Sequence, residues 1–300
     1  MLERIDVAAP FDFQQMLRRP LSRPSKYAVI DPEELSYTRV LRMGERAVPV
    51  TVLGVGSVDA PGLQLVYPDG LTSAEQTVLV RRVRHMFSAD VDLWPFYAMM
   101  ATEPEWRGVM QQLYGLRPIQ DADLFESMVK VIIGQQLNVQ FAATLVDRLV
   151  DFGGEERVWM GKSLPVFPSP ERVAGWTYES LKQLSFSQRK AEYVIDFARA
   201  VVDGQVDLDG VWQMWDDQVY DTLLPLRGIG RWTVECFLLF GAGRPDVMPA
   251  ADIGVQNAVQ KLYGLEHRPS EAEVRHMAQA FAPWRSYATY YLWQSLINVV

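Results

Sequence analysis

The chain has 300 residues, of which 49% are hydrophobic and 22% are charged, as in an average globular protein. This composition excludes a disordered or collagen-like chain, and no run of ~18 apolar residues predicts a membrane span. The formal net charge is −8, and no polybasic tail is present. If nucleic acid is the partner, backbone amides and helix N-termini must therefore supply part of the phosphate contact.

The cysteine content and the N-terminal sequence bear on cellular location. Cys236 is the only cysteine, so the chain can form no internal disulfide and no four-cysteine iron–sulfur cluster or zinc ribbon. The first residues lack the apolar core and the small-residue cleavage site of a secretory signal. We therefore expect a reducing, cytoplasmic compartment.

Residues 1–88 predict a small α+β module with an antiparallel sheet. Residues 47–58 and 63–67 are rich in β-branched side chains and are separated by Gly and Pro, which is typical of strands and turns. Residues 36–39 and 41–44 could add another strand. Residues 72–86 have the apolar spacing of a helix.

Helical periodicity dominates from residue 89 to residue 300. An apolar stripe runs from Phe125 to Ile133, with Asp121 or Asp123 as the predicted N-cap. The stripe stops at residues 134–136 and resumes at residues 139–149. Further helices are expected at residues 170–176, 178–184, 188–203, 216–224, 231–241, 253–263, 270–281 and 284–297. The sequence thus predicts a mostly α fold in which an N-terminal α+β module is followed by helices.

The sharpest motif is LRGIGRWTV, from Leu226 to Val234, between two of these predicted helices. Gly228 and Gly230 permit a tight turn with positive φ and a close approach of the backbone to a partner. Amides of the following helical turn would point outward together and could bind phosphate. An ordinary helical hairpin is the alternative that this glycine spacing leaves open.

Two aspartates follow this motif, on either side of an extended segment that Pro249 ends. Asp252 stands where a helix begins, so its role could be that of an N-cap alone. In a cleft, the same carboxylate would be a fixed negative charge able to stabilise an oxocarbenium-like sugar. Asp246 is the alternative carboxylate.

Together these residues resemble the helix-hairpin-helix, Gly-Pro-Asp superfamily of DNA glycosylases, with Asp252 in PAADIG at the position of the essential aspartate. Residues 125–145, 167–190 and 283–293 extend the resemblance, which is strongest to the 3-methyladenine DNA glycosylase II group. The resemblance implies a helix-hairpin-helix glycosylase architecture, with a cleft between two helical subdomains in residues 89–300. It also implies a hydrolase that flips and excises alkylated bases from duplex DNA in base excision repair.

A base pocket follows from the same resemblance. Trp232 and Trp293 match aromatic residues of that pocket, where an indole face would attract a cationic base of the 3-methyladenine or 7-methylguanine type. Cys236 stands where a third aromatic residue is expected, so the pocket could be larger or its stacking weaker.

Trp232 also bears on the reaction type. Bifunctional members have a lysine at this position, and tryptophan has no amine that could form a Schiff base. The resemblance therefore implies a monofunctional enzyme that leaves an abasic site. A catalytically silent damage-binding protein and a bifunctional glycosylase–lyase are the alternatives.

The remaining site residues lie in two loops. Gln136 matches the wedge that fills the gap left by the flipped nucleotide, with Gln135 and Leu137 as competitors. The hairpin residues expected to contact DNA are Arg227, Gly228, Gly230, Arg231 and Thr233. The arginine at 227 replaces the proline that is usual there, which would loosen the hairpin but add a charge near phosphate.

The resemblance also bears on cofactors and partners. In this superfamily, main-chain carbonyls of the hairpin commonly bind a monovalent cation, sodium or potassium, and they match those of Leu224, Leu226 and Ile229. No other cofactor is expected, and an iron–sulfur cluster is not. The expected partner is double-stranded DNA that contains alkylated bases, and the protein is expected to be a monomer without membrane association.

Overall fold

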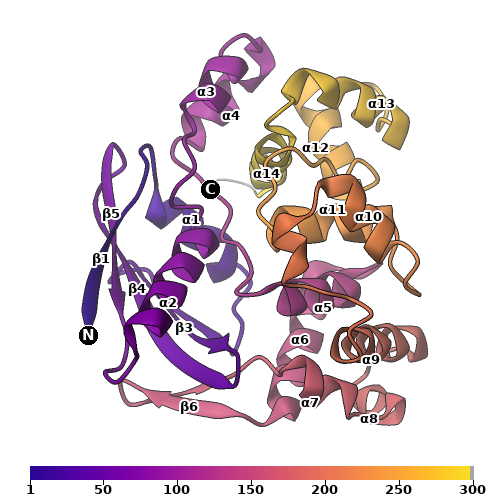
Figure 1. Cartoon of the computed structure of the whole chain (residues 1–300). Helices are drawn as coiled ribbons and strands as arrows, with labels where there is room; N and C mark the ends of the chain where they lie inside the picture. Colours follow the sequence, from indigo (N-terminus) through magenta and orange to yellow (C-terminus); the bar gives the residue numbers. More distant parts are fainter. Residues whose placement is uncertain (298–300) are drawn as a thin grey trace.

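The computed structural model describes residues 1–297, and Figure 1 shows a unit built on a sheet beside a larger helical region. The sheet is antiparallel, with strand order β1-β5-β4-β3-β2. Its longest pairing joins β3 to β4, from Ser36 opposite Leu53 to Met43 opposite Arg46. The strands are β1 (Leu2–Asp6), β2 (Ala28–Asp31), β3 (Ser36–Met43), β4 (Arg46–Ser57) and β5 (Ala60–Val66).

Two helices accompany this sheet, α1 (Phe13–Leu21) and α2 (Ser73–Met86). The predicted helix at 72–86 is confirmed, with Thr72 as its N-cap in a capping box with Glu75. Leu79, Val83 and Met86 of α2 are buried in the core. Figure 1 shows α1 and α2 on the side of the sheet that is turned toward the helical region.

The helical region consists of two groups of helices that follow one another in the chain. Figure 1 shows the first group below the second. The first contains α5 (Leu124–Gly134), α6 (Val139–Gly153), α7 (Pro170–Ala174), α8 (Tyr178–Gln183) and α9 (Gln188–Val202). The second contains α10 (Asp216–Leu223), α11 (Arg231–Phe240), α12 (Ile253–Tyr263), α13 (Glu271–Met277) and α14 (Arg285–Leu296), and the short α3 (Trp94–Met100) and α4 (Arg107–Gln112) lie near α14.

The predicted fold class, mostly α with an N-terminal α+β module, is confirmed. Asp123, one of the two predicted N-caps of α5, accepts the backbone N–H of Glu126. Within residues 1–297, no helix is long and apolar enough to cross a membrane.

Sequence patterning misses β1, β2, α1 and a hairpin formed by β6 (Glu156–Trp159) and β7 (Lys162–Pro165). β1 is an edge strand that carries alternating charges, so it lacks the apolar run of a central strand. The hairpin exposes Val158 and Met160 but buries Leu164 against Val40 of the sheet. It therefore joins the first unit although it lies beyond residue 88 in the chain.

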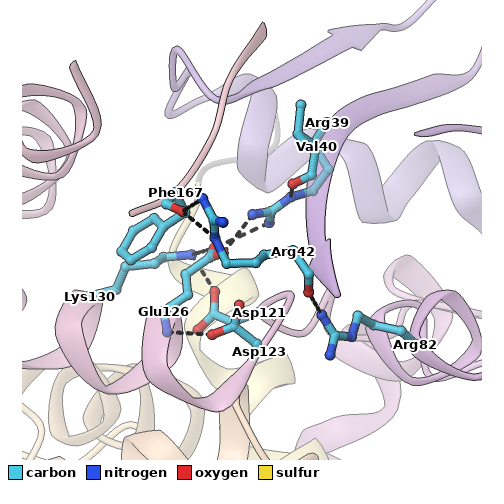
Figure 2. A network of polar contacts seen from close by, with 9 residues as sticks. All are labelled: Arg39, Val40, Arg42, Arg82, Asp121, Asp123, Glu126, Lys130 and Phe167. Atoms are coloured by element: carbon cyan, nitrogen blue, oxygen red, sulfur yellow. Dashed lines mark hydrogen bonds and ion pairs between the residues drawn. The ribbon is translucent and has the colours of Figure 1, made fainter. Parts of the chain in front are cut away.

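A buried ion pair connects the sheet unit to the helical region (Figure 2). Nη1 and Nη2 of Arg39, on β3, donate to the two carboxylate oxygens of Glu126, on α5, at 3.2 and 2.6 Å. Both side chains are almost completely inaccessible to solvent. Lys130, one turn further along α5, pairs with Asp121 and approaches Glu126 at 3.5 Å.

The charges in this network compensate one another. Burial alone would raise the pKa of Glu126, but Arg39 and Lys130 outweigh it and hold that pKa below its usual value. Both cations also lie over the ring of Tyr27: Cζ of Arg39 is 5.3 Å and Nζ of Lys130 is 5.7 Å from the ring centroid. Because an unpaired charge in such a place is very unfavourable, the network fixes the position of α5 relative to the sheet.

Candidate active site

The segment from Leu224 to Gly230, called the glycine hairpin below, connects α10 to α11. Gly228 has a φ of +84°, and a Cβ atom there would lie 2.3 Å from the ring of Tyr193 on α9. Gly230 has a φ of −105°, and a Cβ atom there would meet nothing within 4 Å. Of these two glycines, only Gly228 therefore uses the positive φ and close backbone packing that the sequence permits at both.

Gly230 is the N-cap of α11 and provides no side chain to cap that helix. The first intrahelical bond is donated by Val234 to the carbonyl of Gly230. Among the described residues, the amides of Arg231, Trp232 and Thr233 have no acceptor. These N–H groups together with the helix dipole give α11 an N-terminus suited to a phosphate oxygen.

The two arginines of this region are paired with carboxylates. Arg227 donates to Glu192 at 2.5 Å and lies 5.6 Å from the ring centroid of Tyr193. Arg231 donates to Glu235 at 3.2 Å. Although both side chains are exposed, their charge is partly neutralised, so the amides of α11 carry the less compensated positive charge of this region.

Thr233 was expected to contact DNA, but its side chain is buried. Its hydroxyl accepts a hydrogen bond from the amide of Gln135 at 2.9 Å, and the same amide group donates to the carbonyl of Gly228 at 2.8 Å. Gln135 therefore joins the turn after α5 to the glycine hairpin. This leaves the backbone N–H as the only group of Thr233 that could meet a phosphate.

Gln136 lies at the tip of the turn after α5, where it has a φ of +55° and an exposed side chain. Of its two competitors, Gln135 is held by the glycine hairpin and Leu137 packs against the core. Lys190 supports the turn by donating to the carbonyls of Ile132, Ile133 and Gln135 at 3.0, 2.8 and 2.7 Å. The turn is thus held from two sides, and Gln136 is the residue that points outward.

Asp252 is the N-cap of α12 and is held by three N–H donors. Its Oδ1 accepts from the backbone of Val255 at 3.0 Å and from the indole of Trp293 at 2.9 Å. Its Oδ2 accepts from the indole of Trp232 at 3.1 Å. The structure therefore brings together the predicted aspartate and both predicted tryptophans, although the indoles reach the carboxylate through their edges.

Asp246, the alternative carboxylate, is paired with an arginine. Its two oxygens accept from Nε and Nη2 of Arg285 at 2.6 and 2.7 Å, so its charge is neutralised. Asp252 has no cationic side chain within ion-pair distance in residues 1–297. Of these two aspartates, only Asp252 presents an uncompensated carboxylate.

The aromatic wall beside Asp252 contains residues that the sequence does not single out. The ring of Phe240 lies parallel to that of Trp293, with a centroid separation of 5.5 Å and an interplanar angle of 13°. The guanidinium of Arg19, from α1, lies over Phe240. Because these residues come from three distant segments, no local spacing could have revealed them.

Cys236, on α11, is buried. Burial raises the pKa of its thiol well above the usual value, and the charges of Asp252 and Glu235 raise it further. The thiol is therefore neutral and acts as a small apolar side chain rather than as a nucleophile. Its place in the base pocket stays a prediction.

Gly254 is a further residue that sequence reasoning missed. A Cβ atom at this position would lie 2.9 Å from Oδ1 of Asp252 and 3.2 Å from the indole of Trp293. The absence of a side chain therefore lets Trp293 reach the carboxylate. In the sequence, only its position two residues after Asp252 points to this role of Gly254.

The glycine hairpin offers main-chain oxygens to a cation. Among the described residues, the carbonyls of Leu224 and Ile229 accept no hydrogen bond, and that of Leu226 accepts one from Ile229 at 3.1 Å. Carbonyl oxygens are ligands of the type that the predicted monovalent cation would require. No cluster of three or more His, Cys, Asp or Glu side chains in residues 1–297 could hold a metal.

The family model of the HhH-GPD superfamily base excision DNA repair protein matches residues 129–283. The chain belongs to this family. It is 30% identical to the DNA-3-methyladenine glycosylase of Bacillus subtilis, over 92% of this chain and 91% of that protein. It is 33% identical to the DNA-3-methyladenine glycosylase 2 of Escherichia coli, over 60% of each chain. The resemblance predicted from the sequence is confirmed.

The solved structure of the 3-methyladenine DNA glycosylase from Archaeoglobus fulgidus superposes with a TM-score of 0.84 at 24% identity, covering 99% of this chain and 100% of that one. The helix-hairpin-helix glycosylase architecture is therefore confirmed as well. As a member of the HhH-GPD family, the chain is a DNA glycosylase of base excision repair that hydrolyses N-glycosidic bonds, and DNA is its partner.

Proposed function

We propose that this HhH-GPD protein is a monofunctional glycosylase that flips alkylated bases, of the 3-methyladenine and 7-methylguanine type, out of duplex DNA and leaves an abasic site. The observation that carries this proposal is the Asp252 carboxylate, which three N–H donors hold at the N-terminus of α12 beside an aromatic wall. The names of its relatives from Bacillus subtilis and Escherichia coli support the alkylated substrate.

Asp252 would act on the sugar of the flipped nucleotide. As the bond between C1′ and the base nitrogen breaks, the bonding electron pair leaves with the base and cancels its positive charge. The developing oxocarbenium ion faces the carboxylate, whose negative charge stabilises it. Water then adds to C1′, and its proton passes to Asp252 or to solvent. A cationic base is a good leaving group, so the reaction needs no strong general acid.

DNA binding would rest on the two loops that Gln135 joins. The open amides of Arg231, Trp232 and Thr233 would contact a phosphate next to the lesion, and Gln136 would enter the gap left by the flipped nucleotide. A monovalent cation at the carbonyls of Leu224, Leu226 and Ile229 would add positive charge behind this phosphate. The protein would act as a monomer.

The absence of an amine beside the carboxylate supports the monofunctional assignment. Position 232 carries an indole, and no lysine of residues 1–297 forms a hydrogen bond or an ion pair with Asp252. The indole of Trp232 cannot form the imine that strand cleavage requires.

Lys190 favours the bifunctional alternative to a limited degree. Burial lowers the pKa of its amine to about 8, and the residue lies beside the turn that carries Gln136. A lysine with a lowered pKa is a better nucleophile. However, three carbonyls accept from this amine, so it serves as a support of the turn.

One assay separates these possibilities. The protein is incubated with duplex DNA containing 7-methylguanine, and base release, strand cleavage without alkali and trapping by borohydride are measured. We expect base release, alkali-dependent cleavage and no trapped adduct. An adduct that Lys190→Gln abolishes would establish the glycosylase–lyase alternative. Binding without base release would establish a damage-binding protein.

A further inference from the structure

Arg19 joins the sheet unit to the aromatic wall of the active site. It lies near the end of α1, which Figure 1 shows on the side of the sheet that faces the helical region. Its Cζ atom lies 4.5 Å from the ring centroid of Phe240, 5.5 Å from that of Tyr290 and 6.0 Å from that of Trp293. A cation therefore already covers aromatic faces beside the carboxylate.

These contacts lead directly to the reacting group. Phe240 stacks on Trp293, and the indole of Trp293 donates to Oδ1 of Asp252 at 2.9 Å. The charge of Arg19 also acts on the thiol of Cys236, which feels the charge of Asp252 as well. Arg19 and Asp252 therefore both contact the aromatic wall, Arg19 at the ring of Phe240 and Asp252 at the indole N–H of Trp293.

Arg19 and its neighbour Arg23 lack the carboxylate partner that several other arginines in residues 1–297 have. Arg39, Arg227, Arg231 and Arg285 each pair with a carboxylate. Neither Arg19 nor Arg23 lies within ion-pair distance of a carboxylate in the described part of the chain, although both are partly buried. Burial, with the nearby charge of Arg19, lowers the pKa of Arg23 to about 10.

We propose that Arg19 is a specificity-determining residue of the base pocket, which disfavours positively charged bases relative to neutral bases that carry a hydrogen-bond acceptor. This proposal rests on the proposed function, because it concerns the base that the same pocket accepts. An aromatic wall alone attracts a cationic base. A guanidinium on that wall repels the same cation where water is largely excluded, and it donates to a carbonyl oxygen or ring nitrogen of a neutral base.

The test measures affinity without turnover. Duplexes carry 7-methylguanine, which is cationic, or hypoxanthine, which is neutral and has a carbonyl acceptor. Both have a 2′-fluorinated sugar, which prevents cleavage. Dissociation constants are measured for wild type, Arg19→Gln and Arg19→Lys. The exposed Arg18→Gln is the matched control, because it removes the same charge from the same helix. Each value is divided by that for the undamaged duplex.

We expect Arg19→Gln to shift the preference toward the cationic lesion about tenfold, which corresponds to about 1.4 kcal/mol. Arg19→Lys and Arg18→Gln should leave the preference within about twofold of wild type. A preference that is unchanged in Arg19→Gln, or equally shifted in Arg18→Gln, would overturn the proposal.

The release of 7-methylguanine and hypoxanthine from unmodified sugars is measured in parallel. A wild-type protein that releases neither base would overturn the proposed function, and the role of Arg19 would fall with it. A wild-type protein that releases base, with the same binding preference as Arg19→Gln, would overturn the role of Arg19 alone.

Discussion

The indole of Trp293 donates a hydrogen bond of 2.9 Å to Oδ1 of Asp252, across 41 positions of the sequence. Gly254 leaves room for this contact, and Trp232 makes the equivalent contact with Oδ2. The two tryptophans thus fix the orientation of the carboxylate. This positions a negative charge before the substrate arrives, so that little reorganisation is needed during the reaction.

Trp293→Phe keeps an aromatic ring but removes this hydrogen bond. Because a hydrogen bond to a charged group contributes about 1.5–3 kcal/mol, we expect base excision under single-turnover conditions to slow by about 10–100-fold. Affinity for a duplex with an abasic-site analogue should change little. Trp94→Phe is the control, since Trp94 is exposed and its indole has no hydrogen-bond partner in residues 1–297. Equal rates in both variants would show that the hydrogen bond has no role in excision.

Gly228→Ala and Gly230→Ala form a matched pair in the glycine hairpin. At Gly228 the added methyl group clashes with Tyr193 and the backbone is left-handed, so we expect a loss of about 1–3 kcal/mol in the free energy of unfolding. At Gly230 the methyl group meets no protein atom. Thermal and chemical unfolding measure both effects.

Gly230→Ala should instead weaken DNA binding, because the new methyl group stands where a phosphate would approach the amides of α11. Phosphate contacts carry no sequence information, so the loss should be equal for damaged and undamaged duplexes. Dissociation constants at several salt concentrations measure it. A loss confined to damaged DNA would contradict this role of the hairpin.

Breaking the Arg39–Glu126 ion pair should strongly lower the stability of the fold. Arg39→Met leaves the Glu126 carboxylate buried without its main partner, so we expect unfolding to become easier by about 3–5 kcal/mol at neutral pH. Arg39→Met combined with Glu126→Leu removes both charges and should recover most of this loss. Denaturant unfolding provides the comparison, and a double variant no more stable than Arg39→Met would refute the account.

The same pair gives a pH dependence. Because Arg39 and Lys130 hold the folded-state pKa of Glu126 below the ordinary value of 4.5, the unfolded chain binds the proton first as pH falls. The contribution of Glu126 is therefore complete above pH 4.5 and decreases as pH falls through the lower pKa of the folded state. Glu126→Gln should be less stable than wild type at neutral pH, and the difference should shrink at acidic pH.

The sequence predicts the elements whose signals are local. The apolar stripe of α5, the capping box of α2 and the glycine spacing before α11 each lie within a few residues of the structure they specify. The N-cap position of Asp252 could also be predicted from its local pattern, whereas its catalytic role comes only from the resemblance.

The rest depends on contacts between distant segments. Gln135 joins two loops, and Arg19 reaches an aromatic wall built from α11 and α14. Neither residue differs in its local pattern from an ordinary polar surface residue. β1 escapes prediction because its alternating charges resemble a loop until β5 pairs with it. Two glycines permit the hairpin turn, and the sequence does not show that Gly228 is the one with positive φ.

The most direct test of the central claim is the single-turnover excision of 7-methylguanine by Asp252→Asn. Asparagine keeps the size of the side chain and removes the negative charge that would stabilise the oxocarbenium ion. Loss of one electrostatic stabiliser slows enzymes by about 10²–10³-fold, so we predict at least that decrease, with affinity for damaged duplex within a few fold of wild type. A rate near that of wild type would contradict the assignment of Asp252.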